Sequence, residues 1–452
     1  MSIIKNSKEF ILSSVTKIPN WLNYLFLKAN LWPEKIYGDK YIQNRTRIPN
    51  HDYEARLIAM INYAIENVPY YQKIYTKPIT DINDFRQNVG FIERQTVAEQ
   101  TKDFVSQSVN LANYVKGTTA GTSGKPLKFL AHKDRYQIEL AYIHNMWSRV
   151  GWNYDIRGVL RNHTVQKENV YKINPITKEF IFDNYRLDHQ YAREIYTVLK
   201  KYKIVFIHAY PSAAYQFCKL CKEQDLDLSF IKSFLCGSES VLKFQKEFIT
   251  NELGIKIYSW FGHSEKLVIG GYCEHNNNYH IETDYGYFEL IDSNNQPIKT
   301  IGMLGEIVGS TFHNFGMPLI RYRTGDFAEY VGEECSECGR KMPIIKNIQG
   351  RWDKNLIFKN DGTYVTTTSL NLHNDLYVVI DGIQYAQNQP GELIVLIVRN
   401  QFFKPEHEEL LFKHFINAMG DTNKVEIEYV ETLILQPNGK FEMLINNYKR
   451  ST

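Results

Sequence analysis

A loop of glycines, hydroxyl residues and lysines is the clearest chemical signal in the sequence. It occupies residues 117–128 and reads Gly-Thr-Thr-Ala-Gly-Thr-Ser-Gly-Lys-Pro-Leu-Lys. Glycines let the backbone approach an anion, hydroxyl and amide groups donate hydrogen bonds to phosphate oxygens, and lysines supply positive charge. The loop is not a Walker A motif, because Thr119 and Pro126 stand where that motif needs a glycine and a hydroxyl residue, and it contains no G-x-G-x-x-G fingerprint. The sequence therefore predicts a phosphate-binding loop, with a flexible surface loop as the alternative.

Cysteine spacing predicts a metal site. Cys335 and Cys338 form a C-x-x-C pair, and Cys273 and His280 lie upstream. Three thiolates and one imidazole complete a tetrahedral zinc site, and four protein ligands leave no open position, so the predicted zinc is structural. His275 competes with His280 for the fourth position. Unligated cysteines with a chance spacing are the alternative.

Composition describes a folded, nearly neutral chain. The 452 residues carry 53 Lys and Arg against 50 Asp and Glu, and 43% are hydrophobic. This balance excludes a protein built mainly to bind nucleic acid, and it excludes a disordered acidic chain. No apolar run approaches the ~18–20 residues that cross a bilayer. The few cysteines and the absence of a signal-peptide pattern predict a cytoplasmic protein, while the oligomeric state, a dimer included, stays open.

Strands and helices alternate ahead of residue 260. Candidate strands lie at 203–207, 230–235 and 255–258, separated by candidate helices at 212–224 and 242–253. This order predicts βαβ units and a parallel sheet.

Two further parts complete the expected architecture. Short strands replace helices in a β-rich, zinc-bearing subdomain over about 270–350, and the zinc is expected beside a turn at Asp326. A break at Gly350-Arg351-Trp352-Asp353 divides a domain of residues 1–350 from an α+β domain of residues 351–452. The second domain is expected to contain strands at 376–380, 392–398 and 425–430 and a helix at 405–419.

Four short motifs follow the glycine-rich loop in a fixed order. They are Phe-Gly-His-Ser-Glu at 261–265, Tyr-Arg-Thr-Gly-Asp at 322–326, Gly-Arg-Trp-Asp at 350–353 and Pro-Asn-Gly-Lys at 437–440. Together with the loop, they resemble the motif series of the adenylate-forming (acyl-CoA synthetase-like) superfamily. Val-Pro-Tyr-Tyr at 68–71 and Met-Pro-Leu-Ile-Arg-Tyr-Arg at 317–323 resemble the branch of phenylacetate–CoA ligases and CapK capsular-polysaccharide proteins. The resemblance spans nearly the whole chain.

This resemblance implies an α/β adenylate-forming fold. Its large N-terminal domain would hold mixed sheets flanked by helices, and its small α+β C-terminal domain would be mobile. The activity implied is that of an ATP-dependent, AMP-forming ligase. A carboxylate attacks the α-phosphate of ATP and releases pyrophosphate, and a thiol or amine then displaces AMP from the acyl-adenylate. The first step needs cationic and amide donors around phosphorus and close positioning of two anions.

The resemblance also implies the nucleotide contacts. The loop residues that would hold the β- and γ-phosphates are Thr119, Gly121, Thr122, Ser123 and Gly124. Leu127 stands where many members carry lysine, so either Lys125 or Lys128 would meet the phosphates. The residues expected around adenine are Gly237, Ser238, Glu239, Phe261, Gly262, His263 and Ser264, with Phe261 stacked on the base. Asp326 would accept hydrogen bonds from the ribose hydroxyls, and Glu265 would bind Mg²⁺.

Three residues near and beyond the break complete the implied machinery. Arg351 would contact ribose or phosphate. Asp353 would be the hinge about which the C-terminal domain turns between half-reactions. Lys440 would reach the site only for adenylation, where its ammonium bridges the carboxylate and the α-phosphate.

The acid and the acceptor are less constrained. The residues expected around the acid are His208, Tyr210, Trp260 and Gly270, and a substrate anion or sugar could use His208 or Arg161. The favoured acceptor is an amino group, on a sugar or nucleotide-sugar of a capsular or surface polysaccharide. The alternative acceptor is CoA. A nucleotide-binding scaffold without turnover is an alternative of another class, and the joint presence of Glu265, Asp326, Arg351 and Lys440 argues against it.

Overall fold

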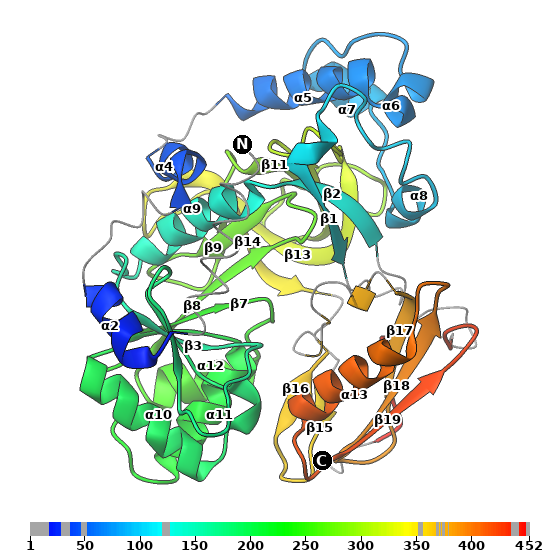
Figure 1. Ribbon diagram of the computed structural model, residues 1–452. Coiled ribbons are helices and arrows are strands. Elements are labelled where there is room, and N and C mark those ends of the chain that lie inside the picture. Colours follow the sequence, from blue (N-terminus) through cyan, green and yellow to red (C-terminus); the bar gives the residue numbers. More distant parts are fainter. Residues whose placement is uncertain are drawn as a thin grey trace.

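A twelve-stranded mixed sheet runs through the N-terminal part of the chain (Figure 1). The computed structural model describes residues 18–28, 37–46, 52–119, 127–350, 356–367, 370, 372, 376–377, 379–434 and 443–448. The strand order is β11-β12-β13-β14-β10-β9-β8-β7-β6-β3-β5-β4. The strands of one half are paired in parallel and those of the other half are antiparallel. Several of the predicted site residues lie near the junction of the two halves, between β8 and β9.

One half of the sheet is parallel, as the alternating pattern predicts. The parallel strands are β5 (Glu179–Ile181), β3 (Arg157–Leu160), β6 (Phe206–Ala209), β7 (Ser233–Gly237) and β8 (Lys256–Gly262). The connecting helices are α10 (His189–Tyr202), α11 (Pro211–Lys222) and α12 (Lys243–Lys246), the last followed by a π-helical segment at Glu247–Glu252. Helices cover this sheet, so β7 is buried along its whole length, which explains its continuous apolar run.

The other half is antiparallel. Its strands are β9 (Ile269–Tyr272), β10 (Tyr279–Ile281), β11 (Gly286–Ile291), β12 (Leu304–Thr311), β13 (Tyr322–Glu334) and β14 (Lys341–Gln349). A short edge strand, β4 (Lys172–Asn174), pairs antiparallel with β5 at the far side. The strands expected over about 270–350 therefore continue the large sheet through the pairing of β8 with β9. Asp326 lies within β13, at an irregularity in its pairing with β12 where Gly325 has a φ of 72°, so the expected turn is a bulge inside a strand and does not end the strand.

A hairpin of β1 (Tyr114–Thr119) and β2 (Leu127–His132) stands beside the sheet. The helices that pack with it are α5 (Tyr53–Asn67), α6 (Pro69–Ile74), α7 (Ile82–Asn88) and α8 (Arg94–Glu99). Helix α9 (Arg135–Ser148) packs against β8, β9 and α4 (Asp39–Arg45), and α2 (Asn20–Lys28) packs against β4 at the far side of the sheet. Asp52 caps α5 by accepting a hydrogen bond from the Ala55 amide, and the helix ends before Pro69. No helix among the described residues is long and apolar enough to cross a membrane.

The C-terminal unit (orange to red in Figure 1) has two small sheets. One pairs β15 (Leu356–Phe358) with β16 (Tyr364–Thr366), and the other has the order β19-β18-β17-β20. Its members are β17 (Ile380–Gln387), β18 (Glu392–Arg399), β19 (Lys424–Tyr429) and β20 (Leu444–Asn446), with α13 (Pro405–Met419) packed on them. The predicted helix matches α13, whereas the strand predicted at 376–380 is wrong, because β17 begins only at Ile380. The division at residue 350 itself stays a prediction.

A buried ion pair ties the N-terminal helices to the sheet. The Arg321 guanidinium donates two hydrogen bonds to Glu289 of β11, at 2.9 and 3.1 Å, and one to the Val89 carbonyl, at 2.7 Å. Both ionic side chains are only 4% exposed. Removing one partner of such a pair leaves an uncompensated buried charge.

We expect Glu289→Gln to lower the free energy of unfolding by about 3–5 kcal/mol, because Arg321 would lose its counterion. The matched control is Glu252→Gln, whose partner Lys222 is about half exposed and whose loss should cost at most about 1 kcal/mol. Urea unfolding followed by circular dichroism measures both. Equal midpoints for the two variants would contradict the assignment of Arg321 as an anchor.

Candidate active site

The carboxyl ends of four parallel strands meet at one edge of the sheet. Arg161 follows β3, Tyr210 follows β6, Ser238 follows β7, and His263 follows β8. Parallel pairing aligns these ends, with Gly237 opposite Trp260. In open parallel sheets this edge is where ligands bind.

Trp260 fixes the spacing between β7 and β8 at this edge. A Cβ atom added to Gly237 would lie 2.5 Å from the indole nitrogen of Trp260. Only glycine therefore lets the indole lie flat against the end of β7. Gly270, on β9, faces His280 and Ile281 of β10, and a Cβ there would come 2.8 Å from Ile281.

Asp326 and the 261–265 motif come together although 60 residues separate them in the sequence. Nε2 of His263 lies 3.4 Å from Oδ2 of Asp326, and both residues are buried. The ring of Phe261 meets the His263 ring edge-on, with centroids 4.8 Å apart, and remains half-buried. Gly262 and Ser264 are exposed beside them.

Glu265 has a partner that the sequence analysis missed. Its Oε1 lies 3.6 Å from Nη1 of Arg94 on α8, and both side chains are largely buried. Backbone pairing between Ile92 and Arg323 brings α8 to β13, and α8 also packs against β2. No local pattern marks Arg94, since only this tertiary pairing brings it to Glu265. Leu127, the residue of β2 that follows the glycine-rich loop, belongs to the same buried cluster as Val97 of α8 and Leu267, so this end of the hairpin lies near the 261–265 motif.

Several predicted residues lie outside the described part of the chain. These are Gly121, Thr122, Ser123, Gly124, Lys125, Arg351, Asp353 and Lys440. Thr119 ends β1 and pairs with Leu127, and Lys128 is exposed on β2. The roles assigned to all of these residues stay predictions, as does the choice between Lys125 and Lys128.

Two of the expected acid-binding residues, His208 and Tyr210, contact Arg161, whereas among the described residues no such contact joins Trp260 or Gly270 to this group. Nη1 of Arg161 donates to Nε2 of His208 at 2.6 Å, and Nη2 donates to Oγ of Ser238 at 2.7 Å. The guanidinium lies over the Tyr210 ring, 4.9 Å from its centroid. Burial and the neighbouring Arg161 charge lower the pKa of His208 well below its usual range, so its imidazole is neutral.

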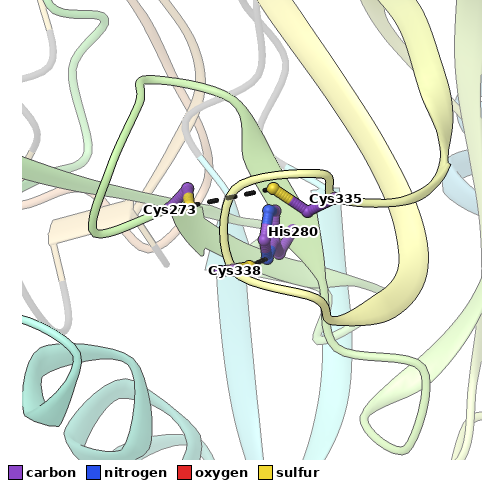
Figure 2. A group of neighbouring side chains, drawn as sticks. All are labelled: Cys273, His280, Cys335 and Cys338. Carbon is purple, nitrogen blue, oxygen red and sulfur yellow. Dashed lines mark hydrogen bonds between the residues drawn. The ribbon is translucent and has the colours of Figure 1, made fainter.

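Figure 2 shows the cysteine cluster, in which Cys273, His280, Cys335 and Cys338 converge from two hairpins. The four ligand atoms lie within 4.8 Å of one another, and Sγ of Cys273 is 4.0 Å from Sγ of Cys335. Zn–S bonds of ~2.3 Å in a tetrahedron place sulfurs roughly 3.8 Å apart, which these residues match closely. Burial lowers the pKa of His280 to about 4, so its imidazole is neutral and suited to a metal.

The geometry favours His280 over His275 as the fourth ligand. Nδ1 of His280 lies 3.9 Å from Sγ of Cys338, whereas His275 offers its backbone amide to Sγ of Cys273 at 3.5 Å. The cluster lies beyond the end of β13 at Glu334, and Asp326 lies near the beginning of that strand. The expectation that the zinc sits beside Asp326 is therefore wrong, and the cluster would brace the opposite end of the hairpin.

A second carboxylate, half-buried, joins the two parts of the chain. Glu239 accepts a hydrogen bond from Oγ1 of Thr366 on β16 at 2.5 Å and one from the Ser212 amide at 3.2 Å. Nearby, Nε2 of Gln245 donates to the Tyr364 hydroxyl at 2.6 Å. Burial raises the pKa of Glu239 despite these hydrogen bonds. A residue expected beside adenine thus also docks the C-terminal unit.

Parts of the sequence resemble those of known proteins. Residues 357–447 match the model of the CapK C-terminal domain. The chain is 22% identical over 453 residues to Protein CapK of Staphylococcus aureus, covering 94% of this chain and 96% of that protein. It is 27% identical over 189 residues to the phenylacetate-coenzyme A ligase of Thermus thermophilus, covering 40% of this chain and 42% of the ligase.

Two solved structures of 2-hydroxyisobutyryl-CoA ligase share the architecture. One, in complex with 2-HIB-AMP and CoA in the thioesterification state, gives a TM-score of 0.58 at 17% identity and covers 92% of this chain and 96% of the ligase. The other, in the postadenylation state, gives a TM-score of 0.55 at 16% identity with the same coverage. The chain has the adenylate-forming fold. The predicted fold class is thereby confirmed, and so is the resemblance to the CapK and phenylacetate–CoA ligase branch.

The resemblance implies a C-terminal unit that turns, and such a motion would break the contact of that unit with Glu239. Release would expose Glu239 to water and remove the desolvation that raises its pKa, which favours the ionised form. Docking is therefore strongest at low pH and weakens as the pH rises through the raised pKa of the docked carboxyl.

We expect small-angle X-ray scattering to show an increasing radius of gyration as the pH rises from about 4, near the ordinary Glu pKa, to neutrality. Glu239→Gln should flatten this dependence, because an amide does not titrate, and Thr366→Val should favour the undocked form throughout. A Gln variant with the pH response of the native chain would contradict the role of Glu239.

We expect the chain, purified without chelator, to contain one zinc ion, and Cys335→Ser to lose most of it together with thermal stability. The physical reason is that a structural zinc contributes folding free energy directly. Elemental analysis and a thermal melt measure the two effects, and Cys221→Ala, outside the cluster, is the control. Full zinc content in Cys335→Ser would count against the site.

Proposed function

We propose that this chain is an ATP-dependent, AMP-forming ligase that activates a carboxylic acid as an acyl-adenylate and transfers the acyl group to an acceptor. One observation carries the proposal. Asp326 and the 261–265 motif meet at the edge where the parallel strands end, within the adenylate-forming fold. The fold supplies the setting, and these side chains supply groups that suit a nucleotide.

Each group has a chemical task in this proposal. The two oxygens of the Asp326 carboxylate suit a vicinal diol, and His263, 3.4 Å away, orients that carboxylate toward the ribose. Phe261 offers an aromatic face for adenine. The glycine-rich loop would surround the outer phosphates, and Arg351 would contact ribose or phosphate.

Glu265 fits a magnesium site. Its carboxylate is a hard oxygen donor, and its contact with Arg94, at 3.6 Å, is longer than a hydrogen bond. Its oxygens are therefore able to ligate a cation. Mg²⁺ bound there would neutralise charge on the phosphate oxygens.

The favoured acceptor is an amino group, on a sugar or nucleotide-sugar of a surface polysaccharide. Similarity to CapK over most of both chains supports the polysaccharide setting of this proposal. The second candidate acceptor is CoA, because the structural neighbour 2-hydroxyisobutyryl-CoA ligase was solved in complex with CoA. Exchange of labelled pyrophosphate into ATP across a library of acids tests activation itself. Later addition of CoA or of amino sugars separates the two acceptors.

We expect Lys440→Ala to abolish pyrophosphate exchange while the fold is kept. Losing one charge contact made in the transition state costs about 3–4 kcal/mol, which corresponds to a loss of roughly 10²–10³-fold in rate. The control is Lys413→Ala, an exposed lysine on α13 of the same unit. If Lys440→Ala exchanges pyrophosphate as fast as the control, Lys440 has no part in the mechanism.

A further inference from the structure

Arg161 differs from the other buried arginines in its partners. Arg149, Arg157 and Arg321 each pair with a carboxylate, respectively Glu282, Glu179 and Glu289. Among the described residues, Arg161 has no carboxylate within 4.0 Å, and its guanidinium binds the neutral His208 ring and the Ser238 hydroxyl instead. A half-buried guanidinium without a counterion is costly unless a ligand provides one.

The acidic side chain near Arg161, that of Glu239, already has other hydrogen-bond partners. Glu239 senses the Arg161 charge, but its two oxygens accept hydrogen bonds from Thr366 and from the Ser212 amide. Its side chain therefore belongs to the contact between the two parts of the chain. It does not satisfy the hydrogen-bonding capacity of Arg161.

Other groups that are able to donate hydrogen bonds lie at the same edge of the sheet. The indole N–H of Trp260 is buried against Gly237 and has no hydrogen-bond partner among the described residues. Because Nε2 of His208 accepts from Arg161, the proton of its neutral ring is on Nδ1. The group thus combines one cation with several donors, and Tyr210 holds the guanidinium in place through its ring.

We propose that Arg161 binds a second anionic group on the acid, a carboxylate or a phosphate, so that the preferred substrate is at least dianionic. One carboxylate is activated at the α-phosphate, and the other anion pairs with Arg161. The fork of the guanidinium suits either oxyanion in a bidentate arrangement. This inference rests on the proposed function and names its substrate class.

Pyrophosphate exchange with matched acids tests it. Succinate and glutarate supply a second carboxylate, 3-phosphoglycerate supplies a phosphate, and butyrate and valerate supply neither. We expect the native chain to exchange with at least one dianionic acid and to favour it over the monoanionic acids by at least about 30-fold in kcat/KM. If succinate or glutarate is favoured, the second anion is a carboxylate. If 3-phosphoglycerate is favoured, the second anion is a phosphate.

The variants separate Arg161 from the nucleotide site. Arg161→Gln should raise the KM for the dianionic acid by about 30-fold or more, leave the KM for ATP unchanged, and change little with monoanionic acids. Arg161→Lys should recover part of the loss, because it keeps the charge without the fork. The control is Arg193→Gln, an exposed arginine on α10 that bonds to Gln224, and thermal melts establish that each variant folds.

The outcomes are distinguishable. Exchange with butyrate or valerate as fast as with every dianionic acid overturns the role of Arg161 and leaves the proposed function standing. A raised KM for ATP in Arg161→Gln, or an equal loss with both classes of acid, also overturns it. No exchange with any acid together with no binding of ATP overturns both the inference and the proposed function.

Discussion

The parallel pairing of β3, β6, β7 and β8 is the constraint on which the rest of the structure depends. It brings the ends of four strands, separated by up to about a hundred residues in the sequence, to one edge of the sheet. Arg161, Tyr210, Ser238 and His263 follow those ends directly. A shift of one residue in any pairing would turn the alternate side chains to the other face. The flat contact between Trp260 and Gly237 and the burial of both faces of β7 oppose such a shift.

The antiparallel half of the sheet completes the site from the other side. Asp326 reaches His263 because β13 lies in the same sheet, and Glu265 reaches Arg94 because backbone pairing brings α8 beside β13. The buried Arg321–Glu289 pair attaches the segment before α8 to β11. The cysteine cluster lies at the other end of β13, where the loops after β9 and β13 meet. These contacts position the site, while the chemistry is assigned to the residues at the strand ends.

Much of this arrangement is predictable from the sequence, because local signals carry it. The alternation of apolar runs predicts β6, β7 and β8 to within a few residues but not the parallel strands β3 and β5, and Pro405 and Gly420 predict both ends of α13. The spacing of Cys335 and Cys338 predicts the cluster that the structure brings together. The positions of Asp326 and of the cysteine cluster at opposite ends of β13 are not predictable in this way. The sequence suggests a turn at Asp326, since Thr-Gly-Asp is common in turns, and the structure has here an irregularity inside β13: the pairing with β12 shifts register opposite Thr324–Asp326, and Gly325 has a φ of 72°. Arg94 and Thr366 carry no local signal, because only tertiary packing gives them their partners.

The central claim is that the carboxylate of the acid becomes bonded to the α-phosphorus of ATP. An acid labelled with ¹⁸O in its carboxylate, turned over in the presence of ATP and acceptor, tests this directly by mass spectrometry of the nucleotide product. Our account predicts that one ¹⁸O atom appears in AMP, because the attacking oxygen stays on phosphorus when the acyl group leaves. Unlabelled AMP, or ADP and phosphate as the products, would contradict it.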